Sequence, residues 1–173
     1  MAKVKHAVVR TDLLAGTDVR SELASVRYQG VNSTTNETEY YDIDNGHFLK
    51  LGDLEDGSRT VFKGEEPSAS DALTDVVLVC NPEVMYDERL NSLDDYYNEA
   101  GKIVRGYRLH ENDIFSVTAD ALDGTPAVGK IVELQADTKG KVVSSATNGS
   151  TVIGEIIDKN IVGRFTYWVI EVQ

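Results

Sequence analysis

The spacing of turn-forming residues in the C-terminal part constrains the fold of this chain most strongly. From residue 127 onward, short runs rich in valine and isoleucine alternate with polar turn signals: Lys-Gly at 139–140, Asn-Gly at 148–149 and Asp-Lys-Asn at 158–160. Turns roughly every ten residues between short β-forming runs are typical of a small barrel or sandwich. We therefore expect a small β-barrel module over residues 124–173.

The preceding part of the chain also consists of short apolar runs separated by loops. The run at 73–80 (LTDVVLVC) is nearly continuous, which indicates a strand buried on both faces, and residues 103–109 and 114–118 predict a hairpin. The small, polar, turn-rich segment at 119–126 is the best internal boundary. We expect three parts: an N-terminal arm with a first strand over 1–30, a β-rich domain over 31–123, and the module over 124–173.

One short helix is expected near residues 90–100. Ser92 followed three residues later by Asp95 has the form of a capping box. Leu90, Leu93 and Tyr97 then stand at positions i, i+3 and i+7, which places one apolar stripe on a helix of about two to three turns. The predicted fold class is therefore mainly β with one short helix, built of small β-barrel or sandwich modules with an N-terminal extended arm.

The charge of the chain limits its partners. The 173 residues carry a net charge of -12, so a nucleic acid would be repelled and we expect no nucleic-acid partner. Residues 1–11, by contrast, contain Lys3, Lys5 and Arg10 and no acid. Two interpretations fit this basic arm: it reaches towards an acidic partner or a neighbouring copy, or it pairs with its own acidic body.

The apolar patterning predicts a soluble chain. No apolar run approaches the ~18–20 residues that a bilayer span requires, so we expect no membrane partner. The N-terminus has positive charge but no apolar stretch behind it, and it does not resemble a secretory signal. The lone Cys80 lies in the apolar run VVLVC, which predicts a small core residue and not a reactive thiol.

The chain shows no motif that predicts catalysis, a metal or a cofactor. His6, His47 and His110 are far apart, and none has a second ligand at metal-binding spacing. The chain has no phosphate-binding glycine motif and no G-x-S-x-G elbow. We therefore expect a protein that is not an enzyme and that needs no cofactor. A hydrolase assembled from carboxylates distant in the sequence stays open as an alternative.

Aromatic residues are the remaining candidates for contact with a partner. They occur as adjacent pairs at 40–41, 96–97 and 167–168, and neighbouring residues on a strand point to opposite faces. Tyr41, Tyr97 and Trp168 could each contribute to an interface, although a place in the core or on ordinary surface explains them equally well. Both faces of residues 164–172 are largely apolar, so we expect this strand to be covered on both sides, by its own sheet packing or by another chain.

Several stretches resemble a known family. The C-terminal segment PAVGKIVELQADTKGKVVSSATNGSTVIGEIIDKNIVGRFTYWVIEVQ resembles the small β-barrel modules of tailed-bacteriophage head decoration proteins, which cement the capsid. NGHFLKLGDL, VVLVCNPEVMYDE and NEAGKIVRGYRLHENDIFSVT are similar to segments of auxiliary head proteins of such phages. The resemblance extends from residue 45 to the C-terminus and contains no catalytic motif.

This resemblance implies a structural virion protein on the outer capsid surface, made in the host cytoplasm. It would stabilise the shell by bridging subunits of the major capsid protein, and it would also contact copies of itself as a homo-oligomer, for which a trimer is one possibility. The residues expected to contact the capsid lie in the arm: Lys3, Lys5, Val8, Val9 and Arg10. The alternative function is a head-fibre or surface-exposed carbohydrate- or host-binding module, with Tyr40 or Trp168 as a stacking platform.

Overall fold

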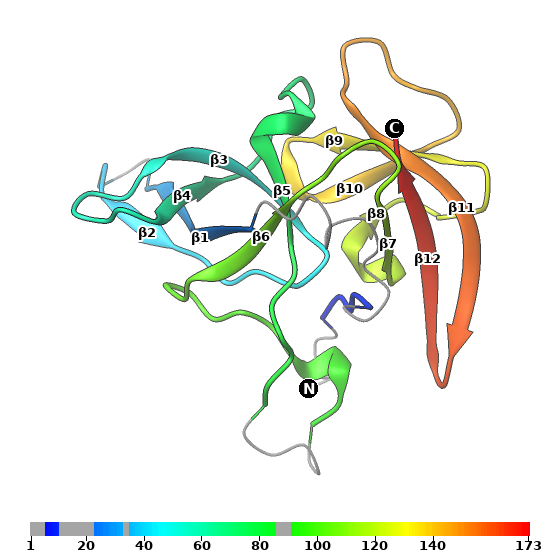
Figure 1. Ribbon diagram of the computed structural model, residues 1–173, viewed down its shortest axis with the longest axis horizontal. Helices are drawn as coiled ribbons and strands as arrows, with labels where there is room; N and C mark the ends of the chain where they lie inside the picture. The colour runs from blue at the N-terminus through cyan, green and yellow to red at the C-terminus, as the bar shows by residue number, and fades with distance from the viewer. Residues whose placement is uncertain (1–5, 11–22, 33–34, 86–90) are drawn as a thin grey trace.

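The computed structural model describes residues 6–10, 23–32, 35–85 and 91–173, and its architecture is mainly β (Figure 1). Two six-stranded sheets make up the fold. In the first sheet, β1 pairs with β4 on one side and with β6 on the other, so five of its strands close into a barrel. The sixth strand, β2, extends the sheet at the far end of β1. The bounds are β1 (Leu23–Val31), β2 (Thr38–Tyr40), β3 (Phe48–Leu54), β4 (Val61–Glu65), β5 (Val76–Val79) and β6 (Val104–Arg108).

The second sheet is a half-barrel with the strand order β7-β12-β11-β9-β10-β8. The first two of its strands along the chain, β7 and β8, precede residue 124, so the sheet begins before the boundary expected at 123/124. The predicted hairpin of residues 103–118 is wrong, because β6 pairs in the barrel and β7 pairs with β12. The bounds are β7 (Ile114–Val117), β8 (Leu122–Asp123), β9 (Ile131–Gln135), β10 (Asp137–Val143), β11 (Val152–Val162) and β12 (Phe165–Val172).

One apolar core lies between the barrel and the half-barrel, and a second one fills the barrel interior. Side chains alternate across a strand, so Leu49 points into the barrel while its neighbour Phe48 packs against the half-barrel. Phe48 meets Phe115 edge-on, with ring centroids 6.1 Å apart. Cys80 is buried in this shared core, which raises the pKa of its thiol to about 12 and confirms the predicted core role. The two units are therefore packed together through this shared core.

The interior of the barrel is too narrow for side chains at two inward-facing positions. A Cβ atom at Gly106 would lie 2.6 Å from Cγ2 of Val77, and one at Gly64 would lie 2.6 Å from Cγ1 of Val26. Both distances are shorter than any normal van der Waals contact. Glycine at these two positions lets the five strands close around a small apolar core.

The helix expected near residues 90–100 is only a 3-10 turn, η3 (Leu93–Asp95). The start signal was interpreted correctly, because the Asp95 carboxylate accepts a hydrogen bond of 2.9 Å from the backbone N–H of Ser92. After Tyr96 the chain returns to an extended conformation, and Asn98 pairs with Ile43 through two backbone hydrogen bonds of 2.9 Å. This long-range pairing replaces the helical hydrogen bonds that the local pattern predicted.

Two of the three predicted C-terminal turns lie inside strands. Residues 139–140 belong to β10 and residues 158–160 to β11, whereas the turn at 148–149 is confirmed, with Gly149 at φ +87°. The hairpin turn after β11 is instead made by Gly163, at φ +61°, and Arg164. Glycine at the first position of a two-residue turn matches the twist of the flanking strands. The strands β11 and β12 therefore form one long ribbon along the flank of the molecule (Figure 1).

Candidate functional site

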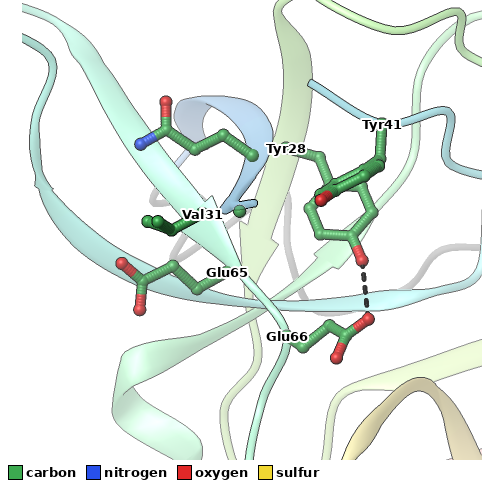
Figure 2. Close-up of a pocket in the computed structure, with 7 residues that line it drawn as sticks. Tyr28, Val31, Tyr41, Glu65 and Glu66 are labelled. Carbon is green, nitrogen blue, oxygen red and sulfur yellow. Dashed lines mark hydrogen bonds between the residues drawn. The ribbon is translucent and has the colours of Figure 1, made fainter. Parts of the chain in front are cut away.

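An open cavity of about 490 Å³ lies beside the end of β1 (Figure 2). It forms where two neighbouring strands separate. β1 pairs with β4 as far as Tyr28 opposite Gly64, and then continues alone on that side while it pairs with β2 on the other. The chain leaves β4 after Glu65. The cavity is lined by Tyr28, Gln29, Gly30, Val31, Tyr41, Glu65 and Glu66.

Tyr41 forms one wall of this cavity because Gly30 leaves room for its ring. A Cβ atom at Gly30 would lie 2.8 Å from Cε2 of Tyr41. The ring of Tyr41 also packs against that of Tyr28, with centroids 5.4 Å apart and an interplanar angle of 53°. The hydroxyl of Tyr41 lies 3.4 Å from the Glu39 carboxylate, to which it donates a hydrogen bond. Tyr41 is 39% exposed, so part of the ring is available to a ligand.

Tyr28 is almost fully buried, and its hydroxyl holds the carboxylate of Glu66 in position at the cavity. Its hydroxyl donates a hydrogen bond of 3.0 Å to Oε1 of Glu66 (Figure 2). Burial, followed by this hydrogen bond and by the Glu66 charge, raises the pKa of Tyr28 far above its ordinary value of 10.0. The phenol therefore stays protonated and acts as a donor that holds the carboxylate in place.

The cavity carries two negative charges. Glu65 and Glu66 are both exposed, and neither makes a salt bridge within the described residues. Lys50 stands opposite Glu65 across the sheet, but its ammonium is paired with Asp71 at 2.8 Å. No basic residue is among those that line the cavity. The site is therefore an acidic hollow lined by two tyrosine rings and two carboxylates.

The structure also locates the residues of the predicted basic arm. Lys3 and Lys5 lie outside the described residues. Val8 and Val9 are buried, at 2% and 3% exposure, and Val9 forms a bridge with Val117 at the edge of the half-barrel. The guanidinium of Arg10 lies over the ring of Tyr167, 5.5 Å from its centroid. Residues 8–10 therefore pack on the body of the protein, and the two interpretations of the basic arm stay open for Lys3 and Lys5.

The three predicted interface aromatics lie in different parts of the protein. Tyr41 belongs to the cavity described above. Tyr97 stacks on His6, with centroids 4.7 Å apart. Trp168 packs against the shared core, and the ammonium of Lys159 lies 5.4 Å from its ring centroid. The second proposed platform, Tyr40, has the guanidinium of Arg27 at 5.5 Å, so both stacking platforms already have a cation beside the ring.

Two of the three histidines have side-chain partners. His6 lies 3.0 Å from Asp44, and His47 lies 3.0 Å from the hydroxyl of Thr138, which joins the barrel to the half-barrel. Burial lowers the pKa of His47 to about 4. Within the described ranges, no group of three or more histidine, cysteine or acidic side chains is arranged to hold a metal ion.

The ribbon formed by β11 and β12 is a second exposed feature. Residues 157–162 of β11 are all exposed, including the apolar side chains of Ile157, Ile161 and Val162. In the part of the chain that the structure describes, no strand pairs with the outer edge of β11 beyond Ile156. At its tip, Arg164 is bound to Asp94 and Ser92, which anchors the ribbon to the body. An anchored ribbon with an open edge can accept a further strand.

Neither the cavity nor the open edge was predicted as a unit from the sequence. Tyr41 was singled out as one of a pair of aromatics, but Tyr28, Glu65 and Glu66 come from segments far from it in the chain. No local pattern shows that a loop bearing these acids faces the end of β1.

Comparisons with protein-family models, with curated proteins and with solved structures found no match. None of the helices in the described ranges is long and apolar enough to cross a membrane.

Proposed function

We propose that this protein is a structural virion protein that binds the outer surface of a tailed-phage capsid. In this role it stabilises the shell by bridging major capsid subunits. The observation that carries the proposal is the open edge of β11, where exposed backbone groups lie next to exposed apolar side chains. The sequence resemblance from residue 45 onward supports the same class of partner.

The edge offers the two components that strand addition requires. Unpaired backbone N–H and C=O groups provide affinity through main-chain hydrogen bonds, and side chains beside them provide specificity. Ile161 is 65% exposed and Val162 is 42% exposed, and both lie in the half of the ribbon beyond the β9 pairing. Burial of a Val or Ile side chain at an interface contributes about 1.5–3 kcal/mol. Covering this surface of the ribbon by a partner is therefore energetically favourable.

Stabilisation of a shell follows from simple linkage. A protein that binds the assembled lattice and not its dissociated subunits stabilises the lattice by mass action. Because a capsid repeats the same site many times, modest affinity at each site is sufficient when one molecule, or one oligomer, contacts more than one subunit. The function needs no chemical step, which agrees with a binding surface that lacks catalytic groups.

The test is co-sedimentation with heads assembled from the major capsid protein of the phage that encodes this chain. We expect saturable binding at a fixed ratio to the capsid subunit, and at least tenfold weaker binding by the Ile161→Asp variant. Val84→Asp is the matched control, because Val84 is 79% exposed and lies outside the ribbon. Absence of binding by the folded wild-type protein would contradict the function. Equal binding by Ile161→Asp would exclude β11 as the contact.

A further inference from the structure

The acidic cavity is lined by ring faces and carboxylates, and among the described residues no Lys or Arg lines it. We propose that it binds a basic side chain, an arginine guanidinium or a lysine ammonium, presented by a partner protein. The inference deepens the proposed function, on which it rests for the identity of the partner as a capsid subunit. The groups that would contact the cation are the rings of Tyr28 and Tyr41 and the carboxylates of Glu65 and Glu66.

The same chemistry already holds basic side chains elsewhere in this protein. Arg27 donates to both carboxylate oxygens of Glu55, at 2.9 and 3.2 Å, while its guanidinium lies 5.5 Å from the centroid of Tyr40. This arginine site combines one acid with one aromatic ring, because the negative charge and the ring quadrupole both attract a cation. The cavity supplies two acids and two rings.

A second arginine repeats the arrangement at the tip of the ribbon. Arg164 forms a salt bridge with Asp94, and its guanidinium lies 4.9 Å from the ring centroid of Phe165. The cavity has the components of these two sites, but no described Lys or Arg side chain fills it. A basic side chain presented by a partner would therefore complete the site.

The hydrogen bonding inside the cavity leaves acceptor capacity for such a ligand. Oε1 of Glu66 accepts from Tyr28, and no hydrogen bond of the described residues uses the carboxylate of Glu65. Two ionised carboxylates offer enough lone pairs for a bidentate guanidinium. A chain of net charge -12 also attracts a cation over a longer range.

The charge distinguishes this ligand from the other classes that bind beside tyrosine rings. An anion is repelled by the two carboxylates, whereas a neutral sugar can donate hydroxyl hydrogen bonds to them but carries no charge for them to attract. A cation gains from both the charge and the rings. The cavity is open to solvent and small in relation to a protein segment, so it fits one side chain and not a folded element.

The test uses a peptide pair that differs only in charge. We would titrate the full-length protein with acetyl-Gly-Arg-Gly-amide and with the citrulline analogue, which has nearly the same shape but is neutral, and follow the NMR signals of Tyr28 and Tyr41. We expect the arginine peptide to shift both signals, to bind at least tenfold more tightly than the citrulline peptide, and to weaken as salt is raised. Equal affinity for both peptides, or no shift at either tyrosine, would overturn the proposal.

Paired variants test the groups directly. The double variant Glu65→Gln, Glu66→Gln keeps the shape of the cavity and an acceptor for Tyr28, and we expect it to lower arginine-peptide affinity at least tenfold. Glu111→Gln, at an exposed turn remote in sequence, is the control and should bind normally. Undiminished binding by the double variant would overturn the assignment, as would a glycan library that binds wild type and the double variant alike at the same tyrosines.

Failure of this inference can be separated from failure of the proposed function. Peptide titration reports on the cavity alone, and co-sedimentation with heads reports on capsid binding alone. If the arginine peptide binds but the heads do not, the cavity assignment stands and the capsid function is contradicted. If the heads bind the double variant as well as wild type, the cavity is not a capsid contact and this inference is contradicted while the function stands.

Discussion

The hydroxyl of Tyr28 and the carboxylate of Glu66 are joined by a hydrogen bond of 3.0 Å that fixes one side of the acidic cavity. The bond connects β1 to the residue that follows β4, at the point where the two strands separate. Because the phenol is nearly buried and the carboxylate is exposed, the pair forms a defined polar edge between barrel and solvent.

Substitution of Tyr28 by Phe tests this bond. We expect Tyr28→Phe to lower the free energy of unfolding by about 1 kcal/mol, since a net hydrogen bond contributes about 0.5–1.5 kcal/mol. Tyr40→Phe is the matched control, because no hydrogen bond of its hydroxyl occurs within the described residues, and we expect a change below about 0.5 kcal/mol. Denaturant unfolding measures both, and an equal effect of the two variants would contradict the role of the bond.

The raised pKa of Tyr28 predicts a loss of folding stability at alkaline pH. Its folded-state pKa lies well above 10.0, near which the unfolded chain titrates, so above that pH the folded state retains a proton that the unfolded state has lost. The stabilisation is therefore complete below pH 10 and decreases as the pH rises further. Burial also raises the pKa of Tyr96, so an absorbance titration at alkaline pH should show late-ionising tyrosines in wild type and one fewer of them in Tyr28→Phe.

The narrow barrel interior predicts the cost of an added methyl group. We expect Gly106→Ala to destabilise the protein by about 1–3 kcal/mol, because the new Cβ atom overlaps Val77. Gly52→Ala is the control, since a Cβ there meets its nearest neighbours at 3.4 Å, an ordinary contact. Adding Val77→Ala to Gly106→Ala should cost less than the sum of the single changes. Additive losses in thermal unfolding would contradict the overlap.

His47 predicts a loss of stability in acid. Burial lowers its folded-state pKa to about 4, so between pH 6.5 and 4 the unfolded chain binds a proton that the folded protein does not. Stability is complete above pH 6.5 and decreases as the pH falls, by an amount on the order of 3 kcal/mol by pH 4. His47→Gln should remove this part of the pH dependence. An NMR titration of the imidazole measures the pKa directly, and an ordinary value near 6.5 would contradict the prediction.

Two truncations test which N-terminal residues contribute to the stability of the fold. Removal of residues 1–5 deletes Lys3 and Lys5 but none of the described contacts. Removal of residues 1–10 also deletes Ala7, Val8 and Val9, which are buried, and the 3.1 Å hydrogen bond from the Val8 backbone N–H to Thr118. We expect the longer truncation to cost about 3–6 kcal/mol and the shorter one less than about 1 kcal/mol, measured by denaturant unfolding. Equal stability of the two proteins would contradict the packing of residues 6–10.

The sequence predicted the class of fold because strands depend mainly on local patterning. Apolar runs such as 76–79 and 131–135 appear as strands in the structure, and the closing strand is covered on both sides, with Ile170 in the core and Tyr167 buried on the opposite face. Turns were less predictable. The Asp-Lys-Asn segment at 158–160 has turn composition, but it pairs with Tyr167 and its neighbours on β12, and this ladder overrides the local preference.

The candidate sites were harder to predict from the sequence than the fold class, because each site depends on strand pairings between residues distant in the sequence. The cavity exists because β1 pairs in parallel with β4, which brings Tyr28 near Glu66, a separation of 38 residues. A parallel pairing leaves no turn signal between its two strands, so pattern and spacing do not predict it. The open edge of β11 is likewise a property of the sheet order and not of its own residues.

The most direct test of the proposed capsid binding is a cryo-EM map of tailed-phage heads reconstituted with this protein, the heads being those of the phage that the proposal implies. The proposal predicts density for the barrel and half-barrel on the outer surface of the shell, repeated at each equivalent site, with β11 in contact with a major capsid subunit. Shells that bear no such density after incubation with excess folded protein, or density only inside the shell, would contradict it.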